Sequence, residues 1–317
     1  MSAQFDTRIT PVRPDLAAAS LKGKVVAERF VEGRLTQVSR GVVDLRAGPS
    51  QDAGLHTQLL FGEQFTVYED KDGWVWGQAT LDGYVGYARR EDFDPPRSPT
   101  HRVVSLATPL LNAPDVKKGA RDMLPMNAMV CVTDSGERFS RTADGHYIFG
   151  GHIAPISHHA SDWVAVAEQF VGIPYVWGGK SSAGIDCSGL VQTALEAGGK
   201  TSPRDTDMME AQLGTSIPLD AELRRGDLIF WKGHVGLMLD AVHLIHANGY
   251  FMQVSLEPLA LVRERTLGKE GVTIRTIKGC SYCSGAGLSA CIRRKAITLM
   301  RSAGRGSPAK LIFVPTT

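Results

Sequence analysis

A cysteine at the start of an amphipathic segment is the feature that most constrains the fold and chemistry of this chain. Cys187 follows Asp186 and opens a segment with apolar residues at 190, 191, 194 and 195, which is the spacing of one helix face. Asp186 suits the N-cap, and the two glycines at 198–199 suit the helix end. The sequence therefore predicts a helix with the thiol in its first turn, where the positive end of the helix dipole favours a thiolate.

Two histidines follow the cysteine at positions that suit a base and a group that orients the base. His234 opens the apolar segment 234–239, and His246 lies in the next one, 243–247. A thiol nucleophile needs a neighbour that takes its proton, and that neighbour needs a partner that fixes its tautomer. We therefore expect Cys187 as nucleophile, His234 as base and His246 as orienting group. Strand alternation places His243 on the opposite face, in a surface or packing role.

Five sequence blocks around these residues resemble, in order and spacing, the NlpC family of bacterial cell-wall peptidases, a branch of the papain-like cysteine hydrolases. The blocks are Pro174-Tyr175-Val176-Trp177-Gly178-Gly179, Asp186-Cys187-Ser188-Gly189, Gly226-Asp227-Leu228-Ile229-Phe230-Trp231, His234-Val235-Gly236 and Ile245-His246-Ala247. The resemblance covers roughly residues 160–278. It implies an α+β domain in which a helix bearing the cysteine packs on an antiparallel sheet bearing both histidines.

The resemblance also implies a substrate. It points to a cysteine endopeptidase that cuts peptidoglycan stem peptides between D-glutamate, through its γ-carboxyl, and the following diamino acid. Family members that act on free muropeptides hold the amine of an N-terminal L-alanine with side chains that correspond here to Tyr175, Asp186 and Ser188. Helix capping is the alternative role for Asp186 and Ser188. Trp177 is expected to pack and to line the cleft, and no metal or organic cofactor is implied.

Two rival functions stay open at this point. One is an amidase or acyltransferase on a lipid or another amide, because the same catalytic groups serve those reactions. The other is a wall-binding module without catalysis. The complete set of cysteine and two histidines argues against a pure binding module. An acyl-lipid substrate would leave the carboxylate of the expected amine site unpaired, which argues against the first rival.

Short alternating segments separated by Asp-Gly turns indicate β-structure in the first half of the chain. The pattern over 33–96 looks like a bacterial SH3-like β-barrel, and 97–156 repeats it more faintly as a second, degenerate SH3-like domain. Residues 1–32 form a lead-in with a short helical candidate at 15–21. The catalytic domain is expected over 157–278. The aromatic side chains of the first barrel are expected to pack rather than bind ligand, namely Trp74, Trp76, Tyr84 and Tyr87.

Composition excludes some classes of partner. A formal net charge of +2 without a Lys/Arg-dense segment argues against nucleic-acid binding. No stretch approaches eighteen uninterrupted apolar residues, so no membrane partner is expected. The beginning of the sequence lacks the pattern of a secretory signal, and five cysteines do not suggest a disulfide framework, so a cytoplasmic location is expected.

The remaining cysteines are assigned no chemistry. Cys131 lies in an apolar run and is expected in the core. Residues 279–317 have poor hydrophobic periodicity and are expected to form a disordered tail. The tail cysteines Cys280, Cys283 and Cys291 lack a fourth ligand for a structural zinc site, so no metal is predicted.

Overall fold

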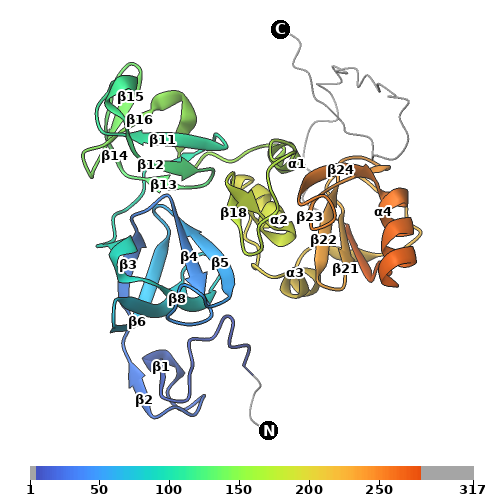
Figure 1. Cartoon of the computed structure of the whole chain (residues 1–317), viewed down its shortest axis with the longest axis horizontal. Coiled ribbons are helices and arrows are strands. Elements are labelled where there is room, and N and C mark those ends of the chain that lie inside the picture. The colour runs from blue at the N-terminus through green and yellow to red at the C-terminus, as the bar shows by residue number, and fades with distance from the viewer. Residues whose placement is uncertain (1–4, 280–317) are drawn as a thin grey trace. The chain divides into compact units, whose positions relative to one another are not determined.

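The computed structural model describes residues 5–279, and the expected tail, with its three cysteines, lies outside them. The chain begins with two short parallel strands, β1 (Leu16–Ala18) and β2 (Arg29–Val31), joined through a 3-10 turn at Ala19–Leu21 (Figure 1). The helix expected at 15–21 is therefore wrong. Leu16 packs with Trp76 and Val85, so tertiary burial outweighs the helical propensity of its alanine neighbours.

Residues 34–94 form a seven-stranded antiparallel sheet with the order β5-β4-β8-β7-β6-β3-β9. Its strands are β3 (Arg34–Val38), β4 (Val42–Arg46), β5 (Leu55–Leu60), β6 (Gln64–Lys71), β7 (Trp74–Ala79), β8 (Val85–Arg89) and β9 (Phe93–Asp94). Asp72 and Gly73 both have positive φ, 51° and 79°, as the tight turn between β6 and β7 requires. Trp74, Trp76 and Tyr84 are buried, which confirms their expected packing role.

Residues 101–155 form two further antiparallel sheets around a separate small core that includes Leu110, Leu124 and Ile148. One sheet contains β10 (His101–Val103), β13 (Met129–Val130) and β17 (Ile153–Pro155). The other contains β11 (Ala107–Leu111), β12 (Ala120–Pro125), β14 (Val132–Ser135), β15 (Phe139–Thr142) and β16 (Tyr147–Phe149). Cys131 lies between β13 and β14 and is only half-buried, so its assignment to the core is wrong.

The remaining described residues combine helices with a six-stranded antiparallel sheet of order β20-β25-β21-β22-β23-β24. The strands are β20 (Thr215–Ile217), β21 (Leu228–Trp231), β22 (His234–Met238), β23 (His243–Asn248), β24 (Gln253–Pro258) and β25 (Thr276–Gly279). The helices are α1 (Trp163–Glu168), α2 (Cys187–Ala197), α3 (Thr206–Gln212) and α4 (Leu259–Arg265), with a π-helical turn at Thr266–Glu270. A two-stranded hairpin, β18 (Lys180–Ser181) and β19 (Gly184–Ile185), precedes α2.

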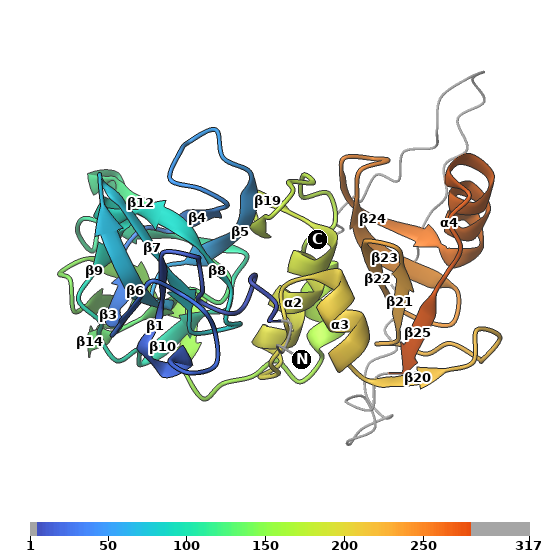
Figure 2. The ribbon, with the colours of Figure 1, turned by 90° about the horizontal axis from the view of Figure 1, so that it is seen from below.

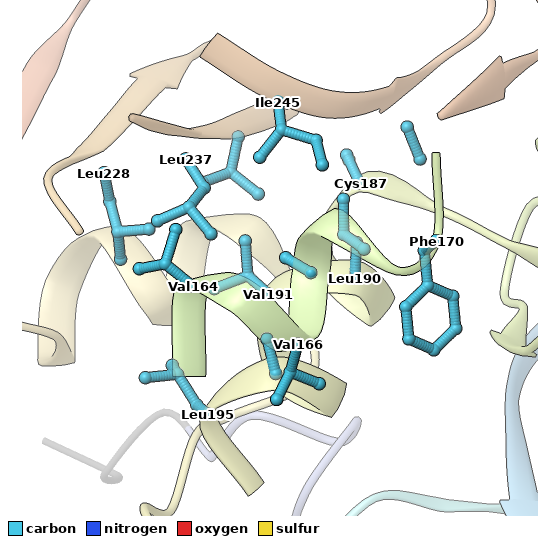
Figure 3. Close-up of a cluster of buried hydrophobic side chains, with 14 of the residues drawn as sticks. Val164, Val166, Phe170, Cys187, Leu190, Val191, Leu195, Leu228, Leu237 and Ile245 are labelled. Carbon is cyan, nitrogen blue, oxygen red and sulfur yellow. The ribbon is translucent and has the colours of Figure 1, made fainter. Parts of the chain in front are cut away.

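Strand alternation explains how this sheet lies between helices. On one face, Leu237 and Ile245 pack against Leu190 and Val191 of α2 (Figure 3). On the other face, Ile229, Trp231, Met238 and Leu244 pack against Leu259 and Val262 of α4. Figure 2 shows α2 on one side of the sheet and α4 on the other. The cysteine-bearing helix is thus fixed against the sheet that carries both histidines, as the sequence predicts.

One strand at the end of the domain differs from its expected position. The resemblance to the NlpC family, together with the alternation of Val272 and Ile274, predicts a final strand at 272–275, but β25 runs from Thr276 to Gly279 and pairs with β20 and β21. Val272 and Ile274 pack beside the α4-side core without joining the ladder. Their alternation therefore reflects side-chain burial before backbone pairing begins.

Candidate active site

The first turn of α2 is built as expected around its cap. Asp186 Oδ1 accepts a hydrogen bond from the Gly189 backbone N–H at 2.7 Å, which confirms the N-cap, and the helix ends before Gly198. Cys187 is the first residue of the helix and is 6% exposed. Its Sγ lies 4.0 Å from Thr206 Oγ1 at the start of α3 and accepts a hydrogen bond from the Val235 backbone N–H. The thiol therefore lies against the residue that follows His234.

The two histidines form a hydrogen-bonded pair on neighbouring strands. His234 Nε2 lies 2.8 Å from His246 Nδ1. His246 Nε2 in turn lies 2.9 Å from Oε1 of Glu257, which lies on the neighbouring strand β24. Since Nε2 of His234 is engaged by His246, Nδ1 is the atom left to exchange a proton with a thiol.

Burial determines the resting protonation of the site. It raises the pKa of the Cys187 thiol to about 11, and the negative charge of Asp186 adds to this rise. Burial also lowers the pKa of His234 to about 3, helped by the charges of His246 and Arg265 and opposed by Glu257. Burial of the sulfur therefore opposes the thiolate that the helix dipole favours. Both pKa shifts favour a neutral thiol and a neutral imidazole, a state in which attack is coupled to proton transfer.

The structure corrects the expected amine site. Asp186 is buried and forms a salt bridge with the fully buried Arg204, at 2.8 Å to Nη2 and 3.0 Å to Nη1. Asp186 Oδ2 also accepts the Gly178 backbone N–H at 2.8 Å, and Ser188 Oγ accepts Arg204 Nη1 at 2.7 Å. Both side chains are thus saturated by groups of the protein itself. These contacts favour the structural role of Asp186, as helix cap and partner of Arg204, over a direct contact with a substrate amine.

The other two expected substrate-binding residues differ in exposure. Tyr175 is half-buried, and burial together with the charges of Cys187 and Asp186 raises the pKa of its phenol, which places it beside the nucleophile. Trp177 is 67% exposed, so its expected packing role is wrong and its indole is available to a ligand.

The seven-stranded sheet contributes polar groups next to this site. Thr57 of β5 accepts a hydrogen bond from Arg204 Nε at 2.7 Å. Tyr84 donates its hydroxyl to Asp205 Oδ2 at 3.0 Å, and the same oxygen accepts Arg8 Nη1 at 2.8 Å. Asp205 directly precedes Thr206, which contacts the thiol, and its side chain is 24% exposed. The partly exposed carboxylate of Asp205 therefore lies close to Cys187, one residue before Thr206 in the sequence.

Sequence reasoning missed three residues of this site, namely Arg204, Asp205 and Glu257. Arg204 and Asp205 lie in a loop without a local pattern that marks them. A signal for Glu257 did exist, because it lies two residues after Ser255 in the strand that follows His246, and strand alternation puts these two polar side chains on the same face. Within the described residues, no group of three or more histidine, cysteine or acidic side chains could hold a metal ion. In that same part of the chain, no helix is long and apolar enough to cross a membrane.

A thiol at a helix start, held against an antiparallel sheet that presents a pair of imidazoles, defines the class of papain-like cysteine hydrolases. Residues 172–269 match the NlpC/P60 family, and residues 45–93 match the bacterial dipeptidyl-peptidase Sh3 domain. Residues 172–269 are thus similar to the NlpC/P60 family, and the chain is a cysteine peptidase.

Individual relatives agree with this assignment over most of their length. The chain is 28% identical to the gamma-D-glutamyl-L-lysine dipeptidyl-peptidase of Bacillus subtilis (strain 168), over 66% of this chain and 78% of that protein. It is 27% identical to dipeptidyl-peptidase 6 of Lysinibacillus sphaericus, over 65% of this chain and 85% of that protein. The fold is similar to that of an NlpC/P60 family protein from Bacillus cereus ATCC 10987, with a TM-score of 0.66, 19% identity and coverage of 78% of this chain and 99% of that one.

Proposed function

We propose that the protein is an endopeptidase that hydrolyses the amide bond between the γ-carboxyl of D-glutamate and the following diamino acid in peptidoglycan stem peptides. The proposal rests on one observation: within the segment that matches the NlpC/P60 family, the Cys187 thiol lies beside the strand that begins at His234, and His234 is hydrogen-bonded to His246. Two relatives that this chain covers for more than two thirds of their length are named gamma-D-glutamyl-L-lysine dipeptidyl-peptidases, which supports the same bond.

The proposed reaction uses His234 twice. As Cys187 Sγ attacks the γ-carbonyl carbon, its proton passes to Nδ1 of His234. The C–N bond then breaks, and the imidazolium returns this proton to the departing amine, leaving a thioester on Cys187. His234 next takes a proton from water, the hydroxide attacks the thioester carbonyl, and the released thiolate recovers the proton.

We propose further that the substrate is a free muropeptide with an N-terminal L-alanine. Asp186 is filled by Arg204, so the carboxylate proposed to meet the substrate's ammonium is Asp205, which keeps exposed surface and has Tyr84 as a neighbour. Arg8 and Tyr84 both donate to Oδ2 of Asp205, so Oδ1 is the oxygen proposed to accept the substrate's ammonium. Tyr175 and Trp177 are proposed to line the path of the peptide between this carboxylate and the thiol.

N-acetylation of the substrate is expected to lower kcat/KM by about 10- to 100-fold, because a charged hydrogen bond to a partly desolvated carboxylate is worth roughly 1.5–3 kcal/mol. The test compares L-Ala-γ-D-Glu-diamino acid peptides, free and N-acetylated, with products identified by mass spectrometry. Asp205→Asn should remove most of the difference between the two substrates, whereas Asp82→Asn, on the neighbouring turn, should retain it. Equal rates of the wild-type protein on both peptides would overturn amine recognition and leave the bond assignment standing.

The fold of residues 97–156 and the cellular role of the protein are two further proposals. We propose that residues 97–156 form a second, degenerate SH3-like domain, since they have several short antiparallel strands and a core of their own. We also propose a role in recycling released wall fragments within the cytoplasm, because free muropeptides arise when the wall is dismantled. Cell fractionation tests the location, and a superposition of residues 97–156 on SH3-like domains tests the fold.

A further inference from the structure

The hydrogen-bonded histidine pair continues into a buried acid that the proposed reaction does not yet use. Glu257 is 8% exposed and lies on β24, directly beside β23, which carries His246. Its Oε1 lies 2.9 Å from His246 Nε2 and accepts the Ser255 hydroxyl at 3.1 Å. Both of its oxygens accept from Arg265 of α4, at 2.6 Å and 3.1 Å. The carboxylate is thus held from three directions.

The charge state of Glu257 follows from these contacts. Burial alone would raise its pKa, but the hydrogen bonds from His246 and Arg265 and their charges outweigh burial and lower the pKa to about 2. An ionised carboxylate only accepts hydrogen bonds. A neutral His246 therefore carries its single proton on Nε2, which faces Glu257, and presents the lone pair of Nδ1 to His234.

The tautomer of His246 also determines the tautomer of His234. Because His246 Nδ1 is an acceptor, His234 must donate from Nε2 across the 2.8 Å contact. A neutral imidazole carries one proton, so Nδ1 of His234 then has a free lone pair. This is the atom that must take the proton of the Cys187 thiol.

We propose that Glu257 is a positioning residue that fixes the tautomers of His246 and His234, so that His234 Nδ1 is the basic atom toward Cys187. This inference rests on the proposed roles of His234 and His246. Glu257 would be a fourth residue of the group formed by Cys187, His234 and His246. It is linked to His234 through two hydrogen bonds and does not contact the thiol. When His234 becomes an imidazolium during attack, the negative charge of Glu257 also stabilises it through His246.

The contacts of Arg265 decide which substitution of Glu257 is informative. Its guanidinium contacts both oxygens of Glu257 and lies over the ring of Tyr250, 4.3 Å from the ring centroid. In Glu257→Gln an amide NH2 at the position of Oε2 opposes one N–H of Arg265, whereas at the position of Oε1 it opposes the other N–H of Arg265 and also His246. Glutamine can therefore keep an oxygen toward His246, and Glu257→Leu, which offers His246 no acceptor, is the variant that tests the tautomers.

The expected result for Glu257→Leu is a fall in kcat of about 10- to 100-fold with KM changed less than about threefold, as for loss of a partner that orients a functional histidine. Glu264→Leu is the matched control, since Glu264 is an exposed acid of the same helix as Arg265. It removes the same charge without facing the histidines, and its kcat should equal that of the wild-type protein.

Histidine tautomers provide a second readout that needs no activity and no variant. Long-range 15N–1H NMR correlations of the histidine-labelled wild-type protein should show both His234 and His246 protonated on Nε2, and Glu257→Leu should give a mixture of Nε2 and Nδ1 tautomers. A wild-type His234 protonated on Nδ1, or a Glu257→Leu variant with unchanged kcat, would overturn the inference. A wild-type protein that is inactive on the tripeptide but has the expected tautomers would instead contradict the proposed substrate.

Discussion

Replacing Cys187 by alanine is expected to reduce hydrolysis of the free tripeptide by about ten-thousand-fold or more, to the background rate. A thiol that forms the covalent intermediate has no substitute in the site, so its loss removes the reaction path and not one contribution to it. The fold should survive, because the change removes one buried sulfur at a cost of about 1 kcal/mol. Product formation measured by mass spectrometry, together with a thermal melt, checks both parts.

Cys131→Ala is the control for the nucleophile prediction. Cys131 is the other cysteine in the described part of the chain and lies between β13 and β14, away from the histidines. It should keep wild-type turnover. A Cys187→Ala protein that folds and still hydrolyses the peptide at more than a few per cent of the wild-type rate would disprove the assigned nucleophile.

Replacing Arg204 by methionine is expected to destabilise the protein by about 3–5 kcal/mol, the largest stability effect that we predict. Arg204 is fully buried, and its loss leaves the carboxylate of Asp186 buried beside Ser188 without its counter-charge. The hydrogen bond to Thr57 of β5 is lost as well. Denaturant unfolding followed by tryptophan fluorescence measures the change in the free energy of unfolding.

A second substitution separates the ion pair from simple loss of packing. Asp186→Asn keeps an oxygen for the Gly189 N–H cap and removes the charge, but it loses the acceptor of the Gly178 N–H, so Arg204→Met combined with Asp186→Asn should recover part of the lost stability. Arg225→Met is the surface control, since Arg225 pairs with Asp162 and Glu168 at 36% side-chain exposure and should cost less than about 1 kcal/mol. A double variant as unstable as Arg204→Met alone would show that the buried charge of Asp186 is not the cause.

The sequence predicted those helices and strands that are determined by residues close to one another in the chain. The α2 helix follows from its apolar spacing and from Asp186 as N-cap, and the strand pattern placed His234 and His246 on neighbouring strands. The helix prediction at 15–21 was wrong because the strand found there packs against Trp76, which lies far away in the sequence. The strand at 276–279 was displaced because burial of Val272 and Ile274 produces the same alternation as a paired strand.

The candidate site was predicted only as far as its residues carry motifs. Asp186 was correctly placed at the helix start, but its role depends on Arg204, which comes from a loop and meets Asp186 only in the folded protein. Protonation could not be derived either, since the helix dipole is visible in the sequence and the burial of the sulfur is not. Glu257 is linked to the base through two hydrogen bonds, which no spacing rule describes.

The central claim is that Cys187 attacks the γ-carbonyl of a D-glutamyl residue. The most direct measurement uses L-Ala-γ-D-Glu with a thiol-reactive chloromethyl ketone in place of the scissile amide, and its α-linked isomer as control. Peptide mapping by mass spectrometry should locate the γ-linked adduct on Cys187, formed much faster than the adduct of the α-linked isomer. Labelling of Cys131 instead, or equal rates of labelling by the two isomers, would contradict the account.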